Sequence, residues 1–287
     1  MQVHIQPTKK QIERYQRLLK EEWSVAALER ALKLIEDVAE LGVVLPAGAE
    51  DGPTSSSEYP ISAHLREEYR ERLEELNTEV RRRAPVDKDR KRISGGDRRL
   101  LELTWRCIAF LTFPAFARSG RDVSAFQLTG NVGFFDDIRS ILFQLAAGEL
   151  LPQLRGHKWD QSRRDLTNAL HFHATNFWRD QPAHQHYLRS VFFQAVGDQA
   201  RAGRELLNAY HTTRPRDPDL GVKAYSYWSF LFEHGQLEQA KEFALEFLRE
   251  CPRDHLDDAR QLVDSSYSAL QPVRRAGGGR KGRVAPA

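Results

Sequence analysis

The chain has 287 residues, with 43 Lys and Arg against 40 Asp and Glu, and therefore a formal net charge of +3. With 40% hydrophobic and 10% aromatic residues, it is too apolar for a disordered protein. Its two cysteines are too few for a disulfide scaffold. A membrane-spanning helix needs about 20 apolar residues, a secretory signal needs an apolar run at the N-terminus, and the sequence has neither. We therefore expect a cytoplasmic protein of one or two domains, with no membrane partner.

The positive charge is concentrated in two segments. Residues 81–99 hold nine basic and three acidic residues, and residues 271–287, which are predicted to form a disordered tail, hold five basic and no acidic ones. Removing these contributions of +6 and +5 leaves the rest of the chain at −8, so we expect that body to repel phosphate. Any contact with nucleic acid is then expected through the two basic segments, by counterion release. The candidate contacts are Arg81, Arg82, Arg83, Lys88, Arg90, Lys91, Arg92, Arg274, Arg275, Arg280, Lys281 and Arg283.

The N-terminal region, residues 1–46, is expected to form a helix or a helical hairpin. Thr8 and Gln11 have the spacing of a capping box, in which each side chain bonds the other residue's backbone N–H. Apolar residues then recur at three-to-four spacing, and Ser24 is positioned to divide this pattern into two helices.

The next 51 residues alternate between linker and helix composition. Residues 47–60 are dense in Gly, Pro and Ser and are interpreted as a linker. Residues 61–83 carry a narrow apolar stripe among Glu and Arg, which predicts a charged amphipathic helix. Residues 84–97 are a second, basic linker.

Residues 98–160 are the most apolar part and predict a hub of buried helices. Within it, Gly130-Asn131-Val132-Gly133 has the glycine content of a phosphate-binding loop. Such a loop follows a strand and ends in Lys-Ser/Thr. We expect no strand before this segment, no Lys-Ser/Thr follows it, and so a turn between two helices is predicted.

The clearest organisation lies in residues 161–270, where two segments align. Gly197 is followed five residues later by Ala202, and Gly235 is followed five residues later by Ala240. Glycine ends a helix through a positive φ, and the small alanine allows a second helix to approach closely. The predicted hairpin helices are 184–196 with 199–211 and 222–233 with 237–250, with an additional helix before them at 165–178 and a capping helix at 256–270.

These hairpins resemble the tetratricopeptide-repeat (TPR) family, which has Gly at the turn, Ala five residues later and Pro twelve residues after that Ala. Gly235, Ala240 and Pro252 match all three positions, whereas in the first hairpin Pro215 comes one residue late. Two residues depart from the small and the large apolar residue that the family prefers: Trp228 and Arg189. The resemblance covers residues 183–252, about a quarter of the chain, and implies helical hairpins stacked as a short solenoid on the N-terminal helical region.

The resemblance also implies a concave groove, lined by the first helix of each hairpin, that binds peptide segments of partner proteins. Ordinary packing between helices is the alternative interpretation of the same side chains. The groove residues that the alignment implies are Tyr187, Val191, Gln194, Tyr225, Ser229, Phe232 and Glu233.

Four histidines lie within sixteen residues, and imidazole is a common metal ligand. Helical residues two apart point about 200° from each other, so neither His-x-His pair can chelate from one face, and we predict no metal site or cofactor. These histidines are His171, His173, His184 and His186.

No catalytic motif emerges, since the chain lacks a nucleophile elbow, a Walker loop and a dinucleotide fingerprint. We therefore expect a non-enzymatic scaffold or adaptor for protein partners, within a larger complex or a homo-oligomer. The alternatives are a nucleic-acid-associated protein that uses the basic segments and an enzyme or regulatory subunit whose site lies in the hub.

Overall fold

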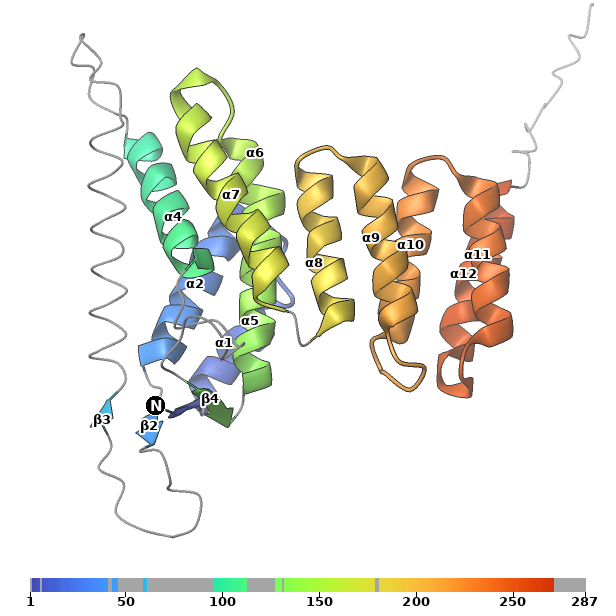
Figure 1. The fold of residues 1–287 in the computed structure, drawn as a ribbon, viewed down its shortest axis with the longest axis horizontal. Helices are drawn as coiled ribbons and strands as arrows, with labels where there is room; N and C mark the ends of the chain where they lie inside the picture. The colour runs from blue at the N-terminus through green and yellow to red at the C-terminus, as the bar shows by residue number, and fades with distance from the viewer. Residues whose placement is uncertain are drawn as a thin grey trace, which may run out of the picture. The chain divides into compact units, whose positions relative to one another are not determined.

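The computed structural model describes residues 2–5, 7–40, 43–45, 59–60, 95–112, 127–130, 132–178 and 181–270 (Figure 1). Helices make up most of these residues, which confirms the predicted all-α fold. The predicted helix 61–83 and tail 271–287 lie outside the described residues, as do the linkers except at their ends.

A small four-stranded sheet accompanies the helices and was not predicted. Its strands are β1 (Gln2–Ile5), β2 (Val43–Leu45), β3 (Tyr59–Pro60) and β4 (Gln127–Gly130), in the order β3-β2-β1-β4. β1 runs antiparallel to β2 and parallel to β4, with Gln2 opposite Gln127. The sheet therefore joins segments that lie far apart in the sequence.

β4 corrects the prediction for the glycine-containing segment 130–133. A strand does precede it, and helix α5 (Val132–Leu145) follows, so the segment joins a strand to a helix rather than two helices. The prediction was wrong because β4 is held by pairing with β1, a partner that its local sequence does not reveal. The Lys-Ser/Thr of a phosphate-binding loop is still lacking.

The N-terminal helices are α1 (Lys9–Leu18) and α2 (Val25–Glu40). The capping box at α1 is confirmed, because Gln11 N donates to Thr8 Oγ1 at 3.3 Å and Thr8 N donates to Gln11 Oε1 at 2.8 Å. Ser24 also divides the two helices as predicted, and its Oγ accepts from Ala27 N at 3.2 Å.

The apolar hub consists of α4 (Gly95–Thr112), α5 and α7 (Asp160–Asn176). A π-helical turn η3 (Ala146–Leu150), the short α6 (Leu151–Gln153) and the 3₁₀ turn η4 (His157–Trp159) connect α5 to α7. α4 packs on α7, and α2 packs on α5. The core is built from Leu, Ile, Phe and Ala side chains of these four helices.

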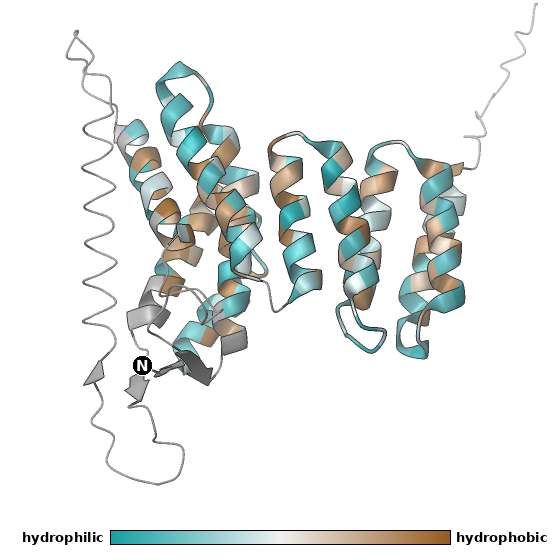
Figure 2. Cartoon of the chain, in the orientation of Figure 1, coloured by the Kyte–Doolittle hydropathy of each residue, from teal (hydrophilic) through white to brown (hydrophobic). Residues whose placement is uncertain are grey.

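The helical hairpins begin after the hub. α8 (Pro182–Ala195) pairs with α9 (Gln199–Thr212), and α10 (Leu220–Glu233) pairs with α11 (Leu237–Glu250). A 3₁₀ turn η5 (Arg253–His255) and α12 (Leu256–Leu270) follow, and α12 packs on α10 and α11. Figure 2 shows that each of these helices carries both hydrophobic and hydrophilic residues, as expected of amphipathic helices.

The contacts divide the chain into two compact units, Met1–Thr212 and Thr213–Ala287. The division falls between the two hairpins, inside the range 161–270 that was predicted as one repeat module. Unit 1 contains the sheet, the hub and α8–α9, whereas unit 2 contains α10–α12.

The turns of the two hairpins have the same hydrogen bonds. Gly197 has φ +84° and Gly235 has φ +72°, the left-handed conformation that was predicted. The backbone N–H of the residue after each glycine donates to a carbonyl oxygen of the preceding helix. Asp198 N donates to Phe193 O, and Gln236 N donates to Leu231 O, each at 2.9 Å. This pattern is a Schellman motif, which satisfies the last carbonyls of a helix.

The two departures from the TPR pattern have partners of their own. Arg189 on α8 forms an ion pair of 2.6 Å with the buried Glu205 on α9, and His186 contacts the same carboxylate at 2.6 Å. Trp228 on α10 donates its indole N–H to Ser266 Oγ on α12 at 2.8 Å. Both departures therefore tie neighbouring helices together.

We expect Gly235→Ala to lower the free energy of unfolding by about 1–2 kcal/mol, because a Cβ is disfavoured in the left-handed conformation. Urea denaturation followed by circular dichroism measures this. Gly148→Ala is the matched control: Gly148 lies in η3 without a positive φ, and an added Cβ would meet open space, so we expect alanine to cost nothing there. Equal stability of the Gly235 variant and wild type would contradict the prediction.

Candidate functional site

The predicted groove residues of unit 1 lie on α8. The hydroxyl of Tyr187 donates to Gln144 Oε1 on α5 at 3.1 Å, and burial raises the pKa of this tyrosine. Val191 is half-buried and Gln194 is exposed. Tyr187 therefore contributes to packing between helices, the alternative weighed for these side chains.

The predicted groove residues of unit 2 face solvent along α10. Tyr225 is 54% exposed, Glu233 is exposed, and Ser229 and Phe232 are half-buried. The Ser229 hydroxyl donates to Glu233 Oε1 at 3.0 Å. Their spacing of three to four residues places them on one side of the helix, so the structure brings this set together.

Val222 extends the same side of α10 and was missed by the sequence prediction. It is 55% exposed and lies three residues before Tyr225. Beneath these side chains the buried Trp228 contacts Tyr225 and Phe232, with ring centroids 5.9 and 5.0 Å apart. We call this surface the α10 surface: Val222, Tyr225, Ser229, Phe232 and Glu233.

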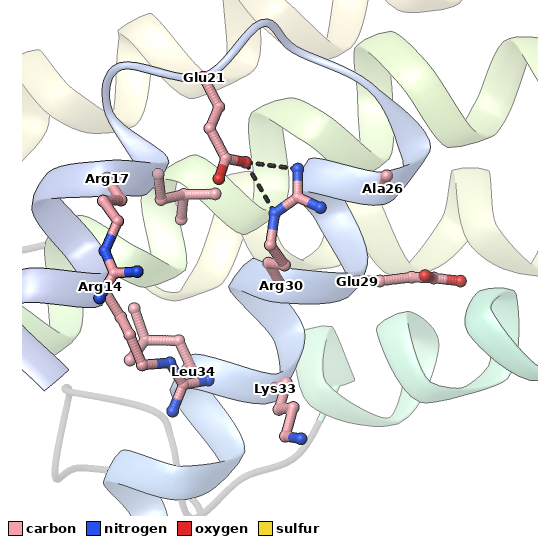
Figure 3. A pocket seen from close by; sticks show the side chains of 9 residues that line it. Arg14, Arg17, Glu21, Ala26, Glu29, Arg30, Lys33 and Leu34 are labelled. Atoms are coloured by element: carbon pink, nitrogen blue, oxygen red, sulfur yellow. Dashed lines mark hydrogen bonds and ion pairs between the residues drawn. The ribbon is translucent and has the colours of Figure 1, made fainter. Parts of the chain in front are cut away.

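The twelve basic residues predicted to contact nucleic acid all lie outside the described residues. The described part of unit 1 nevertheless contains a cationic surface, which sequence analysis missed. A hollow of about 290 Å³ lies between α1 and α2 (Figure 3). Its lining is Arg14, Arg17, Leu18, Glu21, Ala26, Glu29, Arg30, Lys33 and Leu34.

A second hollow of about 320 Å³ continues this surface toward α4. It shares Glu29 and Lys33 with the first and adds Arg99, Glu102, Leu103 and Arg106. We call the two together the α1–α2–α4 hollow. Its described lining has six basic and three acidic residues, so the net charge of −8 on the rest of the chain does not describe this surface.

Two of the acidic residues of the hollow form ion pairs with two of its arginines. Arg30 Nε donates to Glu21 Oε2 at 2.7 Å, as the dashed lines in Figure 3 mark. Arg99 forms a two-pronged pair with Glu29, and this hydrogen bonding lowers the pKa of the Glu29 carboxyl. Arg17 and Lys33 are exposed, and their side chains have no hydrogen-bond or ion-pair partner in the described part of the chain.

The four clustered histidines lie in different surroundings. His171 is exposed and contacts Phe192, and His184 lies edge-on to Trp178 with ring centroids 4.3 Å apart. His186 pairs with Glu205. Within the described ranges, no group of three or more His, Cys, Asp or Glu side chains is placed to hold a metal ion.

His173 is fully buried in the hub. Its Nδ1 lies 3.2 Å from the carbonyl oxygen of Leu111, and its ring stacks on Phe177 with centroids 4.5 Å apart. Burial, reinforced by the positive charge of Arg139, lowers the pKa of His173 well below its usual 6.5. The neutral imidazole therefore donates from Nδ1, and its Nε2 is buried without a hydrogen-bond partner in the described structure.

Two acidic residues of α5, Asp136 and Asp137, differ in environment. Asp136 is buried, 3.9 Å from the guanidinium of the fully buried Arg139. Arg139 in turn lies over the rings of Phe177 and Trp178, at 5.4 and 5.8 Å from their centroids. Asp137 is exposed, so the two carboxyl groups do not form a catalytic pair.

Comparison of the chain with protein-family models, with curated proteins and with solved structures finds no match. None of the helices in the described ranges combines the length and the apolar character needed to cross a membrane.

Proposed function

We propose that this chain is a non-enzymatic scaffold or adaptor with TPR-like hairpins, and that the α10 surface binds an extended or helical segment of a partner protein. The observation that supports this most strongly is a row of apolar side chains, the exposed Val222 and Tyr225 and the half-buried Phe232, on a helix whose other side packs on α11 and α12. The proposal includes the cytoplasmic location that the sequence predicts.

The chemistry of the α10 surface suits peptide binding. Tyrosine and other aromatic residues dominate binding energy at protein interfaces, because they bury large apolar areas at little entropic cost. Ser229, between Tyr225 and Phe232 in the sequence, and Glu233, directly after Phe232, supply hydrogen-bonding groups beside the apolar side chains. The buried Trp228 beneath them holds the two aromatic rings in place without a partner, which reduces the entropy lost on binding.

The test is the double variant Tyr225→Ala plus Phe232→Ala. We expect it to weaken binding to co-purifying partner proteins, or to peptides selected from a display library, by at least about tenfold, since each aromatic contributes about 1–2 kcal/mol at an interface. The matched control is Tyr267→Ala, which removes a similarly exposed aromatic from α12.

The proposal is overturned if no partner or peptide binds reproducibly, or if the double variant and the control bind equally well. Circular dichroism of both variants checks that unit 2 remains folded.

A further inference from the structure

We infer that the α1–α2–α4 hollow binds phosphate groups, and that its natural ligand is a polyanion that carries them along a chain. This site is separate from the α10 surface and goes beyond the proposed scaffold function. The ligand class is inferred from the charge of the hollow, from the geometry of its three helices and from the lack of aromatic residues in its described lining.

The charge of the hollow is not balanced by its own acidic residues. Glu21 and Glu29 are already engaged by Arg30 and Arg99, and among the described residues Glu102 is the one further acidic residue in the lining. The side chains of Arg17 and Lys33 are exposed with no partner in the described residues. A concave surface with an excess of cations concentrates anions, because its low-dielectric walls focus the field.

The helices arrange these cations in rows. Arg14 and Arg17 are one turn apart on α1, and Arg30 and Lys33 are one turn apart on α2, so each pair lies on one side of its helix. Figure 3 shows the two pairs on neighbouring helices around the same hollow. Arg99 on α4 extends the surface across Glu29 and Lys33.

The chemistry of the lining selects phosphate. Arginine donates two parallel hydrogen bonds to phosphate oxygens, and lysine adds a mobile point charge. Within the described part of the chain, three leucines and one alanine are the apolar members of the lining, and none of its residues there is aromatic. The hollow therefore offers no base-stacking surface, and we expect contact with the backbone of a nucleic acid rather than its bases.

The distribution of cations in the hollow favours a long ligand. Its basic side chains lie on three helices, α1, α2 and α4. A polyanion can therefore contact several of them at once, which a single free phosphate cannot do.

The experiment measures binding of a fluorescent mixed-sequence single-stranded DNA of about 20 nucleotides, longer than the roughly 4–16 nucleotides that one single-strand-binding module covers, to the full chain by anisotropy at several salt concentrations. Inorganic tripolyphosphate is the second probe, used as a competitor and by calorimetry. Arg17→Gln plus Lys33→Gln is expected to weaken binding about tenfold and to reduce the slope of log K against log salt by about 1.4, or about 0.7 for each lost contact.

Two further variants keep the inference falsifiable even if the double variant is poorly folded. Glu21→Gln removes a negative charge from the hollow, and we expect tighter binding, a result that misfolding does not produce. Arg214→Gln plus Arg216→Gln removes the same formal charge from exposed positions of unit 2 and is expected to change binding less than about twofold.

Each outcome decides the matter. DNA binding with these effects supports the inference for a nucleic-acid backbone, and binding of tripolyphosphate alone with the same effects supports it for a free polyphosphate. Binding of neither probe, or equal losses in the hollow variant and the unit 2 control, overturns it.

Discussion

Replacing Trp228 with alanine is expected to lower the stability of unit 2 by about 3–5 kcal/mol, the usual cost of removing a buried aromatic side chain. The indole is 7% exposed, contacts the rings of Tyr225 and Phe232, and donates to Ser266 Oγ on α12. Urea denaturation gives the overall loss, and hydrogen exchange of α10–α12 peptides shows whether the loss is confined to unit 2.

Two controls separate packing from hydrogen bonding. Trp228→Phe keeps an aromatic ring but loses the bond to Ser266, and we expect a smaller cost of about 1–2 kcal/mol. Trp23→Ala removes an indole that is 48% exposed in unit 1 and is expected to cost less than about 0.5 kcal/mol. An alanine variant at position 228 that stays within this smaller range contradicts the structural role given to Trp228.

The second large effect is a loss of stability in mild acid, caused by His173. In the unfolded chain this imidazole takes up a proton near its usual pKa of 6.5, whereas in the folded chain burial and Arg139 hold its pKa well below that value. The contribution of the neutral His173 to the free energy of unfolding is thus fully present above pH 6.5. It decreases by up to about 1.4 kcal/mol per pH unit as the pH falls below the unfolded pKa toward the lowered pKa of the folded state.

His173→Asn tests this, because asparagine cannot titrate but retains an N–H that can donate to the Leu111 carbonyl. We expect the variant to be less stable than wild type at about pH 7.5 but to lose less stability between about pH 6.5 and 5. His171→Asn, an exposed change of the same kind on the same helix, is the matched control. The assignment to His173 is rejected if the His173→Asn variant and wild type show the same dependence on pH.

The C-terminal helices could be predicted closely because their boundaries are encoded locally. The predicted helices 237–250 and 256–270 coincide with α11 and α12, and 222–233 differs from α10 only at its start. Gly197 and Gly235 mark helix ends through backbone conformation alone, so no distant contact is needed to recognise them.

The sheet could not be predicted because its strands are only two to four residues long. Such segments are too short for an alternating pattern, and their stability comes from pairing with distant residues. A missed strand then led directly to the wrong interpretation of the segment that begins at Gly130.

Of the two candidate sites, the one on a single helix could be predicted from the sequence, and the one formed by several helices could not. Along α10, the shared direction of Tyr225 and Phe232 could be predicted because one helix determines it. The α1–α2–α4 hollow was missed because it depends on how three helices meet, although the basic pairs at one-turn spacing, Arg14 with Arg17 and Arg30 with Lys33, were a local signal of it. These pairs were overlooked because the net charge was summed over all residues outside the two basic segments.

The parallel pairing of β1 with β4 has a consequence for how the protein is made. Residues 2–5 are synthesised well before their parallel partner strand, residues 127–130, which follows only after α1, α2 and α4. β2 is available to β1 earlier, but the pairing of β1 with β4 must wait during translation, and closing so long a loop is slow compared with forming local helices. Unit 2 has no such delay, because α10–α12 are consecutive in the sequence. Assembly of the sheet is thus expected to set the pace at which unit 1 matures, whereas unit 2 can fold as soon as its three helices have emerged.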